Sequence, residues 1–192
     1  MQTILVVGAT GTVGAPVAQR LLEDGFAVRL LVRDIDRARA ILGREHGYQY
    51  APGQLGDRCS LDRALRGCFG VHVSVSGGSD PATLERVELH GTAMLADLAA
   101  EHGLHRLTYV SGFLAREDLA AAHLESRVKL AAERAIARPS RLTSRPATGG
   151  YRVGTRLPYA ASASISRADL AAFLLDQLDD HAATRGIVEI TT

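Results

Sequence analysis

Three glycines near the N-terminus have the spacing that binds the diphosphate of a dinucleotide. Gly8, Gly11 and Gly14 lie in the segment Gly8-Ala9-Thr10-Gly11-Thr12-Val13-Gly14, directly after an apolar run at residues 4–7. In such a loop the first glycine allows a tight turn, the second lets the backbone approach the pyrophosphate, and the third lets helix and strand pack closely. The N-terminus of the following helix faces the phosphates. We therefore expect nucleotide binding here, with a glycine-rich turn that binds nothing as the alternative.

Three further residues of this loop are candidate contacts of the nucleotide. Thr10 and Thr12 are possible hydroxyl donors to the phosphates, although hydroxyls are common in such turns, and Val13 precedes the third glycine. The loop as a whole, residues 8–14, is the predicted cofactor-binding segment.

Two arginines indicate which dinucleotide the loop binds. Sites that prefer NAD usually carry an acidic residue at the end of the second strand, where this chain has Arg33. A guanidinium offers forked donors to a 2′-phosphate, and Arg37 adds a second positive charge one helical turn later. The pair favours NADP(H). The alternative is a solvated helix start in which Asp34 and Asp36 are the partners of the arginines.

Two more segments follow predicted strands, at the edge where open α/β folds bind ligands. Asp57 is a candidate contact of the adenine amino group, or else the cap of the next helix. Ser76 and Gly77 are candidates to line the ribose.

The elements that position these residues alternate along the chain. Apolar strands are predicted at residues 4–7, 27–32, 48–51, 71–75 and 107–110, with a sixth at 141–144 and a last one at 187–190. Helices are predicted after the glycine loop, from Asp34, and at 82–102, 118–137 and 167–178. Buried strands alternating with helices predict a Rossmann-type doubly wound parallel sheet in three α/β/α layers. Residues 147–164, rich in Gly, Ser, Thr and Pro, are predicted to be a loop that covers a substrate.

Composition narrows the function classes. The chain has 192 residues with a formal net charge of +1, so one domain is expected and nucleic-acid binding is not. No apolar stretch reaches the length of a membrane span, and no leader peptide is recognised, so a cytoplasmic location is expected. Cys59 and Cys68 are expected to be free thiols, and their spacing supports no metal site. The oligomeric state is not readable.

Short motifs in a common order resemble one protein family. The chain resembles the atypical short-chain dehydrogenase/reductase group, in particular NmrA-like proteins and the flavin reductase/biliverdin reductase B branch. The segments that carry the resemblance are residues 8–14, 31–34, 56–57, 110–112, Lys129 with Glu133, 145–146 and 165–170. The resemblance covers nearly the whole chain and implies NADP(H) as cofactor and a small-molecule substrate.

The chain lacks one catalytic feature of typical short-chain dehydrogenases. Those enzymes use a Tyr-x-x-x-Lys pair in which the tyrosine passes a proton and the lysine lowers its pKa. Here no tyrosine lies between Tyr109 and Tyr151, so Lys129 has no partner at that spacing. Alcohol oxidation by that route is therefore disfavoured. Lys129 is a candidate catalytic residue, with a salt bridge to Glu133 on an exposed helix face as the simpler role.

The flavin reductase branch avoids this difficulty, because NADPH passes hydride to an electron-poor flavin or quinone with little acid catalysis. In that interpretation Ser111 orients the nicotinamide or donates to the substrate, and His123 is a candidate proton donor, with a strand-end hydroxyl and a surface histidine as the alternatives. Two other functions stay open: an NmrA-like NADP(H) sensor without turnover, and a tailoring reductase or isomerase of one metabolite.

Overall fold

The computed structural model describes residues 1–43, 47–76, 78, 80–111, 127–130, 137–139, 141–143, 152–154, 164–179 and 188–191. The chain divides into two compact units, Met1–Leu107 and Thr108–Thr192. The expectation that all 192 residues form one domain stays a prediction.

A five-stranded parallel sheet has the order β3-β2-β1-β4-β5, and it belongs to the first unit except for the last two residues of β5. Its strands are β1 (Thr3–Val7), β2 (Ala27–Val32), β3 (Gln49–Pro52), β4 (Gly70–Val73) and β5 (Arg106–Tyr109). Val6 of β1 is paired with Leu30 on one side and His72 on the other. The predicted sheet is confirmed, and its strand order reverses beside β1, where open α/β sheets bind their ligands.

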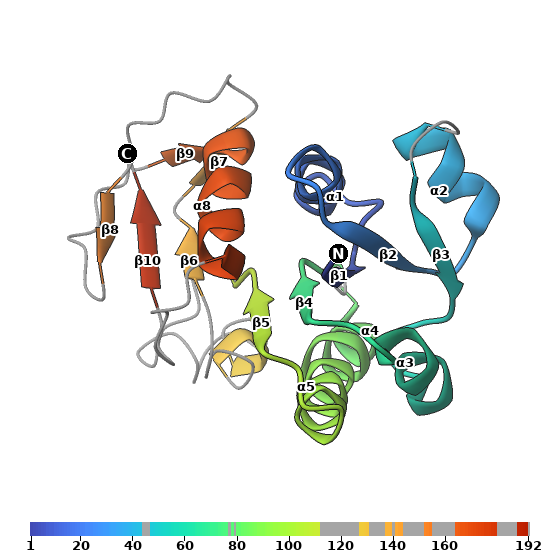
Figure 1. The fold of residues 1–192 in the computed structure, drawn as a ribbon. Helices are drawn as coiled ribbons and strands as arrows, with labels where there is room; N and C mark the ends of the chain where they lie inside the picture. Colours follow the sequence, from blue (N-terminus) through green and yellow to red (C-terminus); the bar gives the residue numbers. More distant parts are fainter. Residues whose placement is uncertain are drawn as a thin grey trace. The chain divides into compact units, whose positions relative to one another are not determined.

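Helices cover both faces of this sheet (Figure 1). On one face lie α1 (Gly14–Glu23) and α2 (Ile35–Leu42); on the other lie α3 (Arg58–Leu65), α4 (Pro81–Leu84), the π-helical segment η1 (Glu85–Gly91) and α5 (Thr92–Glu101). Strands β1, β2 and β4 are almost wholly buried, with Ile4, Leu5 and Val6 at 0% exposure, whereas the edge strand β3 is partly exposed. The three-layer Rossmann-type architecture is therefore confirmed.

The helix predicted at residues 82–102 is interrupted by η1. Gly91 ends this segment, and a Cβ placed on it would lie 2.8 Å from Leu55 Cγ. The helix therefore passes close to the loop after β3. The buried residues of this segment are Glu88 and Gly91, so hydrophobic periodicity gives no signal of the interruption.

The described C-terminal strands form two small sheets. β10 (Val188–Thr191) pairs parallel with β6 (Ala137–Pro139) and antiparallel with β8 (Arg152–Gly154). In the other sheet, β7 (Arg141–Thr143) pairs parallel with β9 (Ser164–Ser166).

This arrangement confirms some sequence expectations and corrects others. The sixth and last strands exist, and the last predicted helix is α8 (Arg167–Asp179). The predicted loop at 147–164 is wrong in part, because it contains β8 and the first residue of β9. Strands of three residues with distant partners carry too little periodicity to be recognised. Of the helix predicted at 118–137, residues 127–130 are helical, Ala137 belongs to β6, and the other positions lie outside the described residues.

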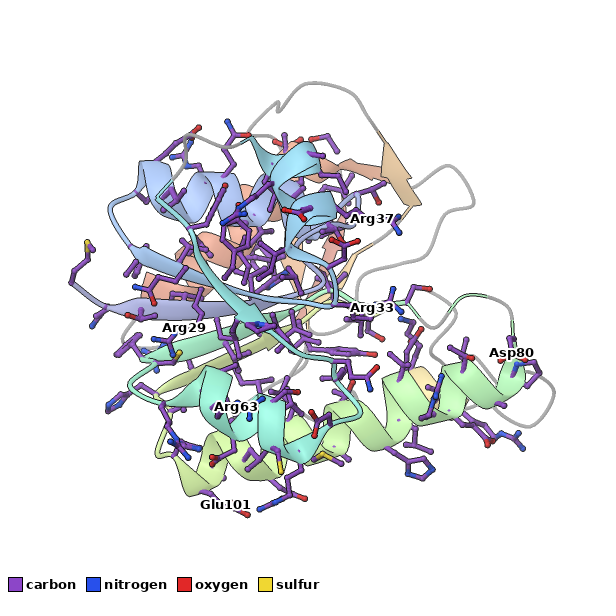
Figure 2. The ribbon with its side chains drawn as sticks, turned by 90° about the vertical axis from the view of Figure 1, so that its right-hand side faces the viewer. Arg29, Arg33, Arg37, Arg63, Asp80 and Glu101 are labelled. Carbon is purple, nitrogen blue, oxygen red and sulfur yellow. The ribbon has the colours of Figure 1, made fainter. Side chains whose placement is uncertain are left out.

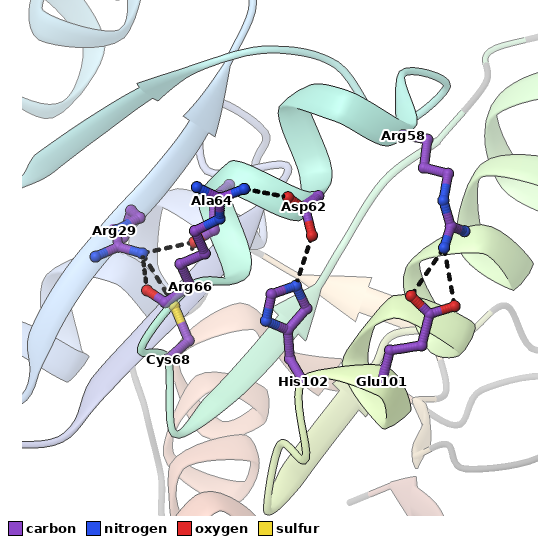
Figure 3. Close-up of polar contacts among 8 residues, drawn as sticks. All are labelled: Arg29, Arg58, Asp62, Ala64, Arg66, Cys68, Glu101 and His102. Atoms are coloured by element: carbon purple, nitrogen blue, oxygen red, sulfur yellow. Dashed lines mark hydrogen bonds and ion pairs between the residues drawn. The ribbon is translucent and has the colours of Figure 1, made fainter.

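Polar contacts join α3 to its neighbours (Figure 3). Arg29 of β2 donates to the carbonyls of Ala64 and Arg66 at 2.7 and 2.8 Å, which satisfies the carbonyl end of α3. Asp62 accepts from Arg66 at 2.8 Å and lies 2.9 Å from His102, and hydrogen bonds from Arg66 and then His102 lower its pKa. These contacts connect α3 to β2 and to the end of α5.

His72 makes the stability of the first unit sensitive to acid. Its side chain is fully buried in β4, and burial lowers its pKa from 6.5 to about 3. His72 therefore takes up a proton near pH 6.5 in the unfolded chain but stays neutral in the folded chain. The free energy of unfolding therefore decreases as the pH falls below that value. We expect His72 to contribute a loss of about 2 kcal/mol in the free energy of unfolding between pH 7 and pH 5.

Denaturant unfolding at both pH values measures this loss. The variant His72→Leu should lack this contribution to the pH dependence, whereas His90→Gln, at an exposed histidine, should keep it. Equal pH slopes for wild type and His72→Leu would contradict the assignment.

Candidate functional site

The glycine loop packs against the end of β4. Gly8 has a φ of 94°, a conformation that side chains rarely adopt, and a Cβ there would overlap the carbonyl of Ser74. A Cβ on Gly14 would overlap the carbonyl of Gly8 and come 2.8 Å from Ser74 Oγ. Both predicted structural roles are confirmed: Gly8 makes the turn, and Gly14 allows the first turn of α1 to approach the end of β1.

Gly11 differs from the other two glycines. A Cβ there would lie 3.2 Å from the Gly8 carbonyl and 3.9 Å from that of Ser74, which is tight but not excluded, and its φ is not positive. Gly11 is exposed, with its N–H donated to Gly8 at 2.9 Å. Of the three glycines, Gly11 is the one that the fold itself requires least. This agrees with the prediction that the absence of a side chain at Gly11 lets a ligand approach the backbone.

The N-terminus of α1 is left open behind this loop. Asp34, Asp57 and Asp80 cap the next three α-helices by accepting backbone N–H groups, but Val13 at the start of α1 supplies no such cap. The first turn of α1 also contains no acidic residue. An uncapped helix N-terminus beside a glycine turn presents N–H donors and a positive dipole end to an anion. This arrangement can hold a pyrophosphate.

The other predicted loop residues have contrasting exposures. Thr10 and Thr12 are exposed, so their hydroxyls are accessible to a phosphate. Val13 is 9% exposed and packs into the core, so any contact it makes with a nucleotide is through its backbone.

Arg33 and Arg37 lie at one edge of the sheet (Figure 2). Both are exposed, Arg33 directly after β2 and Arg37 in the first turn of α2. The acidic partners proposed in the alternative interpretation are used elsewhere: Asp34 accepts from the backbone N–H of Arg37, and Asp36 pairs with Arg39 at 3.5 Å. Among the described residues, neither the guanidinium of Arg33 nor that of Arg37 forms an ion pair. Both groups are therefore accessible to a phosphate.

Asp57 and Ser76, two predicted contacts of the adenosine, each accept a hydrogen bond from a nearby backbone N–H group. Asp57 caps α3 by accepting from the N–H of Cys59 at 3.1 Å, so the capping role is confirmed and the adenine contact stays a prediction. Ser76 is exposed and its Oγ accepts from the N–H of Gly78 at 3.3 Å. Gly77 lies outside the described residues.

The predicted catalytic residues fall in the second unit. Ser111 directly follows Val110 at the end of β5 and is 5% exposed. Lys129 is 7% exposed, so its assignment to an exposed helix face is wrong. Its Nζ lies 5.7 Å from the ring centroid of the fully buried Tyr109, within the range of a cation–π interaction. His123 and Glu133 lie outside the described residues.

Sequence reasoning missed Tyr109 as a neighbour of Lys129, although one signal marked this lysine. The 22 basic residues comprise 21 arginines and a single lysine, Lys129. Lys129 is thus the single basic residue of the sequence that is not an arginine, and it is buried.

The described residues contain neither a candidate metal site nor a candidate membrane-spanning helix. No group of three His, Cys, Asp or Glu side chains there could hold a metal ion. Both cysteines are free thiols, as expected, and burial raises the pKa of Cys68. No described helix is long and apolar enough to cross a bilayer.

The fold and the glycine loop define a dinucleotide-binding protein of the Rossmann class. The pattern of the NAD(P)H-binding family matches residues 8–181. The chain belongs to this family, within the NmrA-like, atypical short-chain dehydrogenase/reductase group.

Curated relatives share part of this chain. Photosystem II assembly factor Ycf39 of Cyanophora paradoxa is 34% identical over 110 residues, which are 57% of this chain and 34% of that protein. A (4-alkanoyl-5-oxo-2,5-dihydrofuran-3-yl)methyl phosphate reductase of Streptomyces griseus is 44% identical over 78 residues, 41% of this chain and 26% of that protein. The chain thus matches about a third or less of the length of these relatives.

A solved structure shows the same fold over the whole chain. The anaerobillin reductase ChuY of Escherichia coli O157:H7 superposes with a TM-score of 0.79 over 98% of this chain and 96% of its own, at 23% identity. At that identity the likeness extends to the fold alone.

The three glycines should respond differently to alanine. Gly14→Ala should lower the free energy of unfolding by roughly 1–3 kcal/mol, because its Cβ meets backbone atoms. Gly11→Ala should stay within about 1 kcal/mol of wild type, yet lose at least about tenfold in NADPH affinity, because its Cβ occupies the space of the pyrophosphate.

Denaturant unfolding and fluorescence titration with NADPH measure the two effects separately. If Gly11→Ala keeps full affinity, the loop does not hold the pyrophosphate at this position.

Proposed function

We propose that this protein is an NADPH-dependent reductase of a planar, electron-poor acceptor such as a flavin or a quinone. The observation that carries the proposal is that a chain with an open dinucleotide loop has no tyrosine four residues before Lys129. Glu125 occupies the position four residues before Lys129, where typical dehydrogenases have their proton-passing tyrosine. An acceptor that takes hydride without prior protonation does not need that tyrosine.

The reaction balances without an additional redox partner. NADPH held at the glycine loop would supply a hydride with its two electrons, so that NADP⁺ and a reduced acceptor with one negative charge would result. A proton from solvent then completes the dihydroflavin or hydroquinone. In this scheme the protein orients the two planar rings, Ser111 donates a hydrogen bond to nicotinamide or acceptor, and Lys129 offsets the negative charge. His123 is a further candidate proton donor.

The choice of NADPH over NADH rests on Arg33 and Arg37. Two exposed guanidinium groups one helical turn apart suit a 2′-phosphate, whereas an NAD site would need an acidic residue for the ribose hydroxyls. In this proposal Thr10 and Thr12 contact the phosphates, Asp57 contacts the adenine amino group and Ser76 lines the ribose. Gly77, the other sequence candidate for the ribose, lies outside the described residues.

Two relatives support alternative functions. The reductase of Streptomyces griseus acts on a dihydrofuranone phosphate, which favours a tailoring reductase with a conjugated carbonyl acceptor. The assembly factor of Cyanophora paradoxa favours a protein that binds the dinucleotide and docks a partner without turnover.

The variant Arg33→Asp tests the cofactor preference. We expect its NADPH affinity to fall about 10- to 100-fold, because a charge-assisted contact to the 2′-phosphate is replaced by repulsion. NADH affinity should change less than about threefold. Isothermal titration with both dinucleotides measures the preference, with Arg63→Asp, at an exposed position of α3, as the matched charge change. An unchanged ratio of the two affinities would refute the role of Arg33.

Turnover is tested by following NADPH absorbance with FMN, FAD, quinones, dichlorophenolindophenol and a butenolide as acceptors. We expect oxidation with at least one of them, and a decrease in kcat of at least about tenfold for Ser111→Ala. NADPH binding without turnover on any acceptor would favour the sensor, and turnover of the butenolide alone would favour the tailoring reductase.

A further inference from the structure

The single lysine of the chain lies where a positive charge is costly. Lys129 is 7% exposed, and an ammonium withdrawn from water needs compensation. Arginine occupies the other 21 basic positions, so the lysine is not a matter of general composition. A compact ammonium differs from the planar guanidinium in size and in how it meets a ligand. Lys129 therefore places a compact positive charge where solvent has little access.

The ring of Tyr109 lies directly beside this charge. Nζ of Lys129 is 5.7 Å from the centroid of the Tyr109 ring, so the ammonium lies over the face of the ring. Such a contact is stronger when it is desolvated, and here both side chains are buried. Tyr109 ends β5 and Lys129 belongs to the helical turn at residues 127–130, so tertiary folding brings them together.

Ser111 shares this location. It lies two residues beyond Tyr109, and Val110 between them forms a β-bridge. Because side chains alternate along extended chain, Tyr109 and Ser111 project to the same side. Ser111 is 5% exposed, so a buried ring, a buried ammonium and a buried hydroxyl gather at the end of one strand.

We propose that Tyr109 is a positioning residue, which holds the ammonium of Lys129 through its ring face at the carboxyl end of β5. The charge so placed stabilises the anion that an acceptor becomes when it takes hydride from NADPH. The tyrosine of a Tyr-x-x-x-Lys pair passes a proton through its hydroxyl; the hydroxyl of Tyr109, in a side chain with 0% exposure, has no such task. Because no tyrosine lies four residues before Lys129 to pass a proton, this charge suits acceptors whose anion is delocalised, such as flavins, quinones and conjugated carbonyls. This inference rests on the proposed reductase function.

Two variants at position 109 separate the ring from the hydroxyl. Tyr109→Phe keeps the ring face and should keep kcat within about threefold of wild type, whereas Tyr109→Leu should lower kcat about 10- to 30-fold. The KM for NADPH should change less than about twofold in both variants, because the dinucleotide loop is untouched. A loss in Tyr109→Phe as large as in Tyr109→Leu would overturn the role of the ring.

A double-mutant cycle with Lys129→Met tests whether Tyr109 acts through Lys129. Tyr109→Leu should reduce kcat less than about twofold further when Lys129 is already methionine. Additive losses would mean that Tyr109 has a separate effect, for instance on folding of the second unit.

The single lysine also permits a measurement that needs no turnover. Growth with ¹³C,¹⁵N-lysine labels one residue, so the spectrum contains one lysine spin system. Its Hε protons should be shifted upfield by the aromatic ring in wild type and Tyr109→Phe, and should return to the free-lysine position in Tyr109→Leu.

The two measurements distinguish failure of the contact from failure of the proposed function. A wild-type lysine signal without an upfield shift refutes the contact whatever the activity. A shifted signal in a protein that binds NADPH but reduces none of the acceptors leaves the contact intact, and refutes the reductase function and with it the catalytic purpose of the pair.

Discussion

The close approach of three backbone segments at the end of β1 is the constraint on which the first unit depends. Gly8, the start of α1 at Gly14, and Ser74 after β4 meet at distances that no side chain on either glycine would allow. This contact sets the direction in which α1 leaves the sheet and brings the end of β4 against the turn. Because the strand order reverses between β1 and β4, the same contact creates the edge where a dinucleotide is held.

The caps of the helices follow from this arrangement. Three helices begin with an aspartate that satisfies their N–H groups, which stabilises them at no cost to binding. An aspartate at the start of α1 would bring a negative charge to the place where phosphates are expected. Without a capping side chain, α1 is slightly less stable, but its N-terminal N–H groups stay available to an anion.

The electrostatic contacts of the first unit fall into two groups. One group holds α3 in place: Arg29 donates to carbonyls at the end of the helix, and Asp62 pairs with Arg66 and His102. The other group, Arg33 and Arg37, is exposed at the carboxyl edge of the sheet, with the nearby aspartates used for a helix cap and for Arg39. The arginine that holds α3 and the two exposed arginines at the carboxyl edge are thus distinguished by their partners, not by their residue type.

The sequence by itself determined the parallel sheet, the helices that flank it and the place of the glycine loop. These features arise from local patterns: apolar runs, helical periodicity and glycines at fixed spacing, all readable within about 15 residues. The arginines at the end of β2 and Ser111 after β5 were located for the same reason, since strand ends follow from strand positions.

Only the tertiary structure decided what surrounds those residues. The three-residue strand β8 is defined by its distant partner β10, and the close approach of Gly91, at the end of η1, to Leu55 joins segments that lie far apart in the sequence. Lys129 looked like an exposed helical residue because its spacing to Glu133 is local, whereas its burial and its contact with Tyr109 join positions 20 residues apart. Burial and long-range contacts depend on how the whole chain packs, and no local pattern encodes them.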